Sequence, residues 1–172
     1  MIPKLDQLII QANNILLSLT HLGYEIGCGI TQEGKILQPF SSGHNNKIDL
    51  PEEYLDLIKS GGLFIHYHPK GFSLSLTDYE MAHYFKLYSI RAIVLNGLKG
   101  KGTYYINNPG IYDINKIRAL YKTYFSHERM KLDIKCQINA KLIYQREYRK
   151  IDRKVWLKIK NKTGLEYCWK GF

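Results

Sequence analysis

The stretch from residue 63 to residue 82, LFIHYHPKGFSLSLTDYEMA, constrains the fold more than any other part of the chain. Its apolar and aromatic positions around His66 and His68 are typical of a strand, and Pro69 marks the strand end because proline cannot donate to a sheet ladder. Gly71 provides the freedom to turn. Ser75 then stands where a helix N-cap is expected, with Asp78 three residues later. The pattern predicts a strand, a turn and a helix in succession.

This local order brings three potential metal ligands together. His66 and His68 are two residues apart, so on a strand their side chains point to the same face, and the turn folds Asp78 back beside them. Two neutral imidazoles and one carboxylate leave the fourth position of a tetrahedral zinc ion to water, as in hydrolytic sites. The spacing therefore indicates a hydrolytic zinc site, although Ser-x-x-Asp is also the capping-box pattern of an ordinary helix start.

The residues His66, His68, Pro69, Ser75 and Asp78 resemble the signature of the JAB/MPN/JAMM zinc metallopeptidases and their RadC-like, phage and toxin relatives. In that family a His-x-His, usually followed by proline, precedes a serine and, three residues later, an aspartate. The segment from His68 to Ser75 is one residue shorter than in the commonest form of the family. This difference affects the expected path of the loop more than the ligands at its two ends. The resemblance implies a single-domain α/β fold with a JAB/MPN-like (cytidine-deaminase-like) mixed sheet flanked by helices.

The resemblance also implies an activity, the hydrolysis of a peptide or isopeptide bond, and further site residues. The family carries an upstream strand glutamate beside the metal-bound water. Glu25, in the predicted strand over 24–31, is the matching candidate, because a carboxylate among small and apolar residues is costly to bury without a partner. Glu25 is thus the expected general base, and Ser75 the expected oxyanion donor. An edge-strand glutamate that faces solvent is the alternative interpretation.

Hydrophobic periodicity predicts the remaining elements. At 172 residues the chain can bury one core. We expect a JAB/MPN-like core over 1–110 and a basic, mainly helical C-terminal extension over 111–172 packed on it, with a turn at 107–110 between them. The other predicted elements are helices over 3–19, 51–59, 79–87, 114–125 and 151–160, a hairpin formed by 24–31 and 36–40, and strands over 90–95, 103–106 and 165–169.

The charge of the chain is unevenly distributed. The net charge is +10, and residues 112–172 account for all of it with 16 Lys and Arg against 6 Asp and Glu. Such a skew can mark a surface for nucleic acid or an acidic partner, and more commonly it marks a solvated helix face. Two classes of partner are therefore expected. One is a protein or peptide substrate, such as a ubiquitin-like tail, as the resemblance implies. The other is nucleic acid, bound by a RadC-like or toxin-associated domain through its basic region.

Cysteine usage and hydropathy exclude several other classes. Cys28, Cys136 and Cys168 form no Cys-x-x-Cys pair, which argues against a disulfide framework, a cysteine-rich zinc site and a zinc deaminase. No apolar run approaches the length of about 20 residues that crosses a bilayer, and no signal peptide is evident. We therefore expect a cytoplasmic protein without a membrane partner. A metal-free interaction module and a Cys28-based thiol protease are the remaining alternatives.

Overall fold

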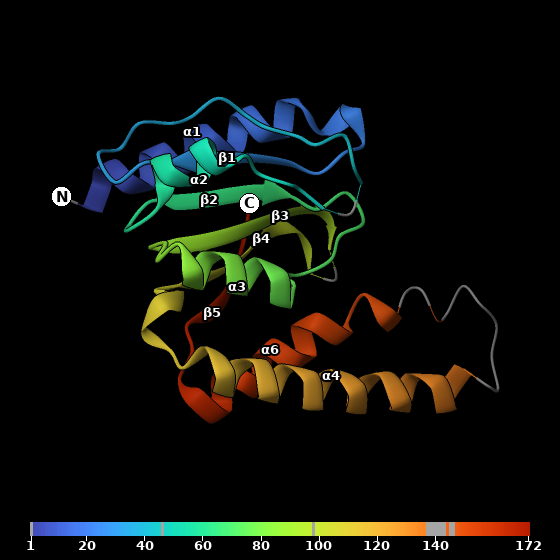
Figure 1. The fold of residues 1–172 in the computed structure, drawn as a ribbon. Coiled ribbons are helices and arrows are strands. Elements are labelled where there is room, and N and C mark those ends of the chain that lie inside the picture. The colour runs from blue at the N-terminus through green and yellow to red at the C-terminus, as the bar shows by residue number, and fades with distance from the viewer. Residues whose placement is uncertain (1, 46, 98, 137–143, 145–146) are drawn as a thin grey trace.

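A computed structural model gives the structure of the chain and describes all residues except 1, 46, 98, 137–143 and 145–146. The chain forms an α/β domain in which helices flank both faces of a five-stranded mixed sheet (Figure 1), as the sequence predicts. In the described part, no helix combines the length and the apolar character needed to cross a membrane.

The strands follow one another across the sheet in chain order. The second and third strands are parallel, and every other neighbouring pair is antiparallel. The third strand is therefore central, which confirms the prediction made from its apolar, β-branched sequence. The strands are β1 (Ile26–Ile30), β2 (Leu63–Tyr67), β3 (Ser89–Gly97), β4 (Gly100–Asn107) and β5 (Tyr167–Gly171).

Helices cover both faces of the sheet, and one face carries more of them than the other (Figure 1). The first helix packs on one face, where Ala12 and Leu16 bury their side chains in a cluster with Ile65 and Ile93. The later helices share a larger hydrophobic cluster on the other face. The helices are α1 (Ile2–Ser18), α2 (Glu52–Ile58), α3 (Leu76–Tyr84), α4 (Ile114–Cys136) and α6 (Ile151–Thr163), with short 3-10 turns η1 (Thr20–Leu22) and η2 (Pro109–Ile111).

The predicted hairpin is wrong in its second arm. Residues 36–40 return beside β1 but meet it only at the isolated bridges Ile30–Ile36 and Gly27–Phe40. The cause is the hydroxyl of Tyr54 on α2, which accepts the N–H of Gly29 at 2.8 Å and donates to the carbonyl of Gln38 at 3.0 Å. A side chain from another element therefore takes the hydrogen bonds that a regular ladder would use.

Two helix boundaries also differ from the predictions. The helix predicted over 79–87 ends at Tyr84, and Lys86 has a φ of +50°, which the helical conformation excludes. The helix predicted over 114–125 continues to Cys136. Its extra turns include Glu128, which is buried because it pairs with Lys158 on α6. Sequence periodicity missed this extension because the buried face there carries a charged residue.

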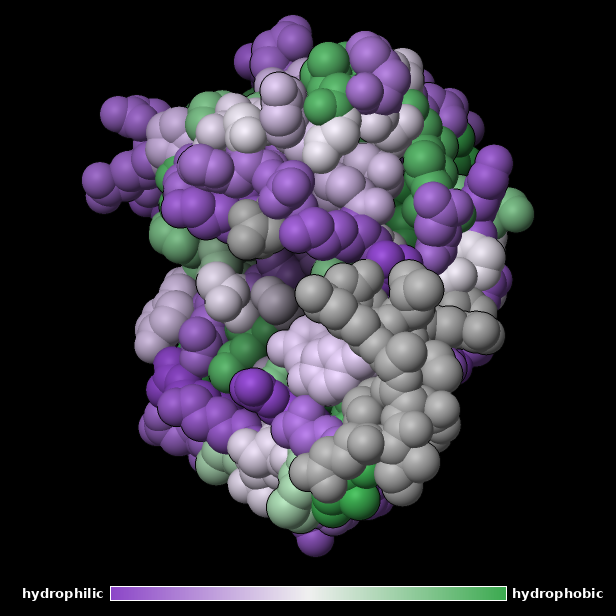
Figure 2. Space-filling view, turned by 90° about the vertical axis from the view of Figure 1, so that its right-hand side faces the viewer, coloured by the Kyte–Doolittle hydropathy of each residue, from purple (hydrophilic) through white to green (hydrophobic). Residues whose placement is uncertain are grey.

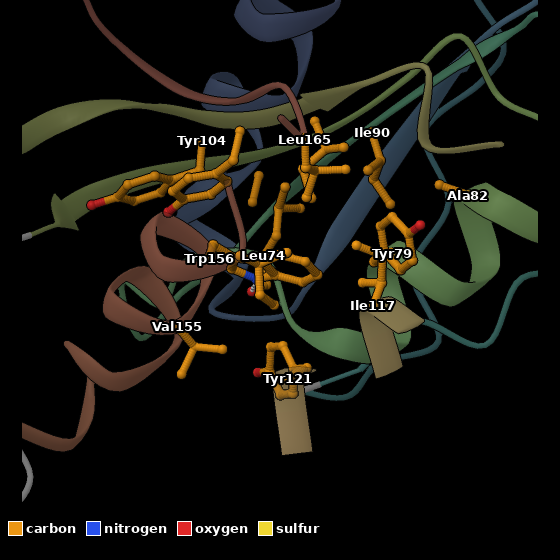
Figure 3. Close-up of a cluster of buried hydrophobic side chains, with 14 of the residues drawn as sticks. Leu74, Tyr79, Ala82, Ile90, Tyr104, Ile117, Tyr121, Val155, Trp156 and Leu165 are labelled. Atoms are coloured by element: carbon orange, nitrogen blue, oxygen red, sulfur yellow. Dashed lines mark hydrogen bonds between the residues drawn. The ribbon is translucent and has the colours of Figure 1, made fainter. Parts of the chain in front are cut away.

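The C-terminal segment shares its core with the rest of the chain. Strand β5 adds to the edge of the sheet beside β4. Figure 3 shows Trp156 of α6 beside Leu74 and close to Tyr79, which belong to the first 110 residues, and Tyr121 of α4 below them. The indole N–H of Trp156 donates to the Leu74 carbonyl at 2.7 Å. Helices α4 and α6 therefore support the loop that leads into α3.

Candidate metal centre

Two imidazoles meet at the end of β2. His66 lies in β2, and His68 follows its last residue, with a backbone N–H that donates to the Ile93 carbonyl of β3 at 2.9 Å. Both side chains are buried. Both point to one side, and their Nε2 atoms are 2.7 Å apart. Pairing with the central strand thus holds the second histidine in line although the strand itself has ended.

The turn after the strand brings in a carboxylate. Gly71 adopts a φ of +72°, in the left-handed region that favours glycine, and its N–H donates to the His68 carbonyl at 3.0 Å. Helix α3 then starts with a capping box, in which the Asp78 N–H donates to Ser75 Oγ at 3.1 Å and the Ser75 N–H donates to Asp78 Oδ2 at 2.6 Å. The cap fixes the carboxylate, leaving its Oδ1 at 3.3 Å from Nε2 of His66.

The carboxylate of Asp78 is ionised in this setting. Burial raises its pKa, but the charge of His66 and a hydrogen bond to that ring outweigh burial, with a further contribution from His68. Together they hold the pKa of Asp78 well below its usual range. Asp78 therefore serves as helix cap and as an anionic neighbour of both rings, so the capping role of Ser-x-x-Asp is compatible with the predicted role of Asp78 as a metal ligand.

The hydrogen bonds around His68 set its tautomer. Its Nδ1 lies 2.9 Å from the carbonyl oxygen of Phe72, which can only accept, so Nδ1 carries the proton. Nε2 of His68 then presents a lone pair toward Nε2 of His66. Two lone pairs at this separation repel each other unless a proton or a metal cation lies between them. The carbonyl of Phe72 thus orients the ring of His68, as outer carbonyls orient the histidine ligands of metal sites.

The three side chains fit a metal ion. Their ligand atoms all lie within 4.8 Å of one another, so His66, His68 and Asp78 could hold a cation. A tetrahedral ion with ligands at about 2.0 Å keeps the ligand atoms about 3.3 Å apart. The distance from His66 Nε2 to Asp78 Oδ1 is 3.3 Å, that from His68 Nε2 to Asp78 Oδ2 is 3.8 Å, and the two rings are closer, at 2.7 Å. To hold such an ion, the two Nε2 atoms would move apart by about 0.6 Å.

Glu25 lies beside this group on the same side of the sheet. It immediately precedes β1, and its backbone is fixed by hydrogen bonds from its N–H to the His44 carbonyl and from the Ser41 hydroxyl to its own carbonyl. Its carboxylate Oε1 is 3.9 Å from His68 Nε2, beyond hydrogen-bonding distance. Burial raises the pKa of Glu25 to about 6, with Asp78 adding to the rise and His68 opposing it. The acid is adjacent to the three residues that could hold an ion and is not part of that group.

All five predicted residues line one cavity of about 730 Å³. Figure 2 views the end of the molecule toward which β2 runs, and a hollow bordered by hydrophilic residues is visible near its centre. The C-terminal segment contributes Asp152 to the cavity wall, hydrogen-bonded by the hydroxyl of Tyr121. Burial raises the pKa of Asp152 to about 6. Sequence reasoning missed Asp152 because an acid in the first turn of a helix is usual.

The thiol of Cys28 is unsuited to nucleophilic catalysis. Its side chain is fully buried in the cluster beneath α1 and donates to the Leu37 carbonyl at 3.2 Å. Burial raises the pKa of this thiol to about 11, so the thiolate is scarce at neutral pH. The thiol-protease alternative is therefore not supported.

Comparisons of the chain with protein-family models, with curated proteins and with solved structures give no match.

Proposed function

We propose that this protein is a zinc-dependent hydrolase of peptide or isopeptide bonds, related to the JAB/MPN-type metallopeptidases. The observation that carries the proposal is the convergence of two imidazoles and two carboxylates, from two separate segments of the chain, in one cavity. His66, His68 and Asp78 would hold the ion. When bound, zinc supplies a Lewis acid that lowers the pKa of a water molecule to about 7.

Glu25 is the proposed general base. It is close to the ligands but not hydrogen-bonded to them, which leaves its carboxylate available to a water molecule in the cavity. In the metal-free protein its pKa of about 6 leaves it ionised at neutral pH. The ionised carboxylate can take a proton from the water molecule and return it to the leaving amine. The same burial that disfavours its charge in the resting protein thus prepares it for proton transfer.

Ser75 is the proposed donor to the oxyanion of the tetrahedral intermediate. A hydroxyl has one proton, and that of Ser75 is donated to Asp78 Oδ2 at 2.8 Å. Stabilising an oxyanion requires that this O–H turn toward the substrate. Asp78 would keep the backbone N–H of Ser75 at 2.6 Å throughout, so its carboxylate remains fixed while the hydroxyl turns.

Two variants separate the roles of base and ligand. Glu25→Gln should retain zinc and lose turnover of a peptide substrate by a factor of about 100 or more. His68→Ala should lose both. Glu33→Gln, which changes an exposed turn glutamate, is the matched control and should lose neither. Metal content, measured by atomic spectroscopy, and turnover are determined for each of the three variants and for the wild type.

Two outcomes would contradict the proposal. Full turnover by Glu25→Gln would remove the assignment of the base. A wild-type protein that purifies without metal and is not stabilised by added zinc would remove the metal centre.

The basic C-terminal segment gives weaker support to the nucleic-acid alternative. Lys131, Lys154 and Lys158 on α4 and α6 converge on the buried Glu128, at 3.7, 3.6 and 2.6 Å. Part of the positive charge of these helices is thus neutralised within the protein and stabilises their packing. We therefore put forward hydrolysis alone.

A further inference from the structure

A second, smaller cavity adjoins the metal centre. It measures about 370 Å³ and shares Lys70, Phe72 and Tyr148 with the cavity described above. Tyr144 and Arg149, which precede α6, complete its lining. A substrate chain in the metal cavity can therefore continue into this second one, which we call the aromatic subsite.

The aromatic subsite offers a preformed apolar surface. The rings of Phe72 and Tyr148 meet edge to face at 6.5 Å, and Tyr144 stacks on Tyr148 at 5.9 Å. Phe72 is also the residue whose carbonyl fixes His68. Rigid aromatic rings give contact area at a low entropic cost, and they suit a flat or apolar side chain.

The subsite also carries two exposed cationic side chains. Lys70 and Arg149 are exposed, and neither forms an ion pair with an acid among the described residues. Lysines on α4 and α6, by contrast, pair with Glu128. Two unpaired cations at the edge of an aromatic surface attract a ligand that has both carboxylates and apolar groups.

The neighbouring carboxylates decide between a peptide and a nucleic acid. Beyond the subsite, the cleft is lined by Glu25 and Asp152, two acids outside the proposed ligand set. A nucleic acid that continued along it would bring a phosphate at every nucleotide against these acids, and like charges in such a setting repel. A peptide can place its acidic side chains beside Lys70 and Arg149 and neutral ones beside the metal centre.

We propose that the aromatic subsite binds an acidic segment of a protein substrate, with aspartate or glutamate side chains paired to Lys70 and Arg149 and an apolar side chain on Phe72 and Tyr148. This inference rests on the proposed peptidase function and specifies its substrate class.

Binding can be measured apart from turnover in a Glu25→Gln background. The probes are two short fluorescein-labelled peptides, capped at both ends, one containing glutamates and a phenylalanine and the other with glutamine in place of each glutamate. Fluorescence anisotropy at low salt should show tighter binding of the acidic peptide. Lys70→Gln and Arg149→Gln should each weaken that binding about three- to fivefold and leave the glutamine peptide unaffected, as exposed ion pairs predict.

Lys162→Gln is the matched control, because it removes an exposed lysine of α6 outside both cavities. Equal losses in this control, equal binding of the two peptides or no binding of either would overturn the subsite. So would tighter binding of a single-stranded oligonucleotide that depends on Lys70 and Arg149.

The two proposals fail separately. Charge-dependent peptide binding without zinc-dependent cleavage by the wild-type protein would refute the hydrolase and keep the subsite. Cleavage without a preference for acidic peptides would refute the subsite and keep the hydrolase.

Discussion

Replacing Glu25 by glutamine removes a buried negative charge while it preserves the shape of the side chain. Beyond the loss of turnover, the structure predicts that this change stabilises the metal-free protein. Burial raises the pKa of Glu25 from 4.5 to about 6, which means that folding is penalised whenever this carboxyl is ionised. The shift corresponds to about 2 kcal/mol, since one pKa unit is worth about 1.4 kcal/mol.

The pH dependence follows from the direction of the shift. Between pH 4.5 and about 6 the folded protein holds a proton on Glu25 that the unfolded chain has released, so wild-type stability falls as the pH rises through that window. Glutamine cannot ionise and escapes this loss. The free energy of unfolding of Glu25→Gln should therefore equal that of the wild type below the window and exceed it by about 2 kcal/mol above it.

Urea unfolding in the presence of a chelator, at a pH below the window and again at neutral pH, measures this difference. Glu33→Gln controls for the loss of one negative charge and should give no stabilisation, because Glu33 is exposed and a hydrogen bond from Thr31 lowers its pKa. A Glu25→Gln variant that is no more stable than the wild type at neutral pH would refute the view that Glu25 is a desolvated carboxylate held for proton transfer.

Three further predictions concern the metal and the packing that supports it. Zinc at about 100 times its Kd should stabilise the wild type by roughly 2.7 kcal/mol in the same urea assay, and His68→Ala should abolish this gain; a gain in the variant as well would place the ion elsewhere. Trp156→Phe should cost about 1–3 kcal/mol, because the Leu74 carbonyl loses its buried donor; unchanged stability by circular dichroism would contradict this. Glu128→Gln should cost about 1 kcal/mol at neutral pH, and the cost should disappear in acid, because hydrogen bonding to Lys158 lowers the pKa of Glu128 and its contribution is lost as the pH falls through that value; a cost that persists in acid would show that packing is responsible.

Local sequence signals predicted most of the residues of the candidate site. His66, His68, Ser75 and Asp78 lie in one contiguous segment, where strand alternation, a glycine turn and a helix cap fix the direction of each side chain. These rules act over a few residues and do not depend on what packs around them. The strand and the helix cap at Ser75 accordingly lie where the sequence predicts them, although the helix ends earlier than predicted, at Tyr84.

Other features depend on contacts between distant parts of the chain. The hydroxyl of Tyr54 interrupts the predicted hairpin, and the pairing of Glu128 with lysines of α6 accompanies a helix longer than its apolar pattern suggested. Sequence periodicity reports which face of an element is apolar, but it does not report which side chain of another element will reach that face. Both differences arise from such long-range contacts.

By itself, the sequence of this protein determined a central apolar strand and a compact His-His-Asp segment with a helix cap. Only the tertiary structure decided that Asp152 of the C-terminal helix and Arg149 before it stand beside that segment, and that Glu25 is desolvated next to it. The physical reason is that side-chain direction within a segment follows from backbone geometry. The meeting of separate segments follows instead from burying the two hydrophobic clusters against the sheet, a property of the whole chain.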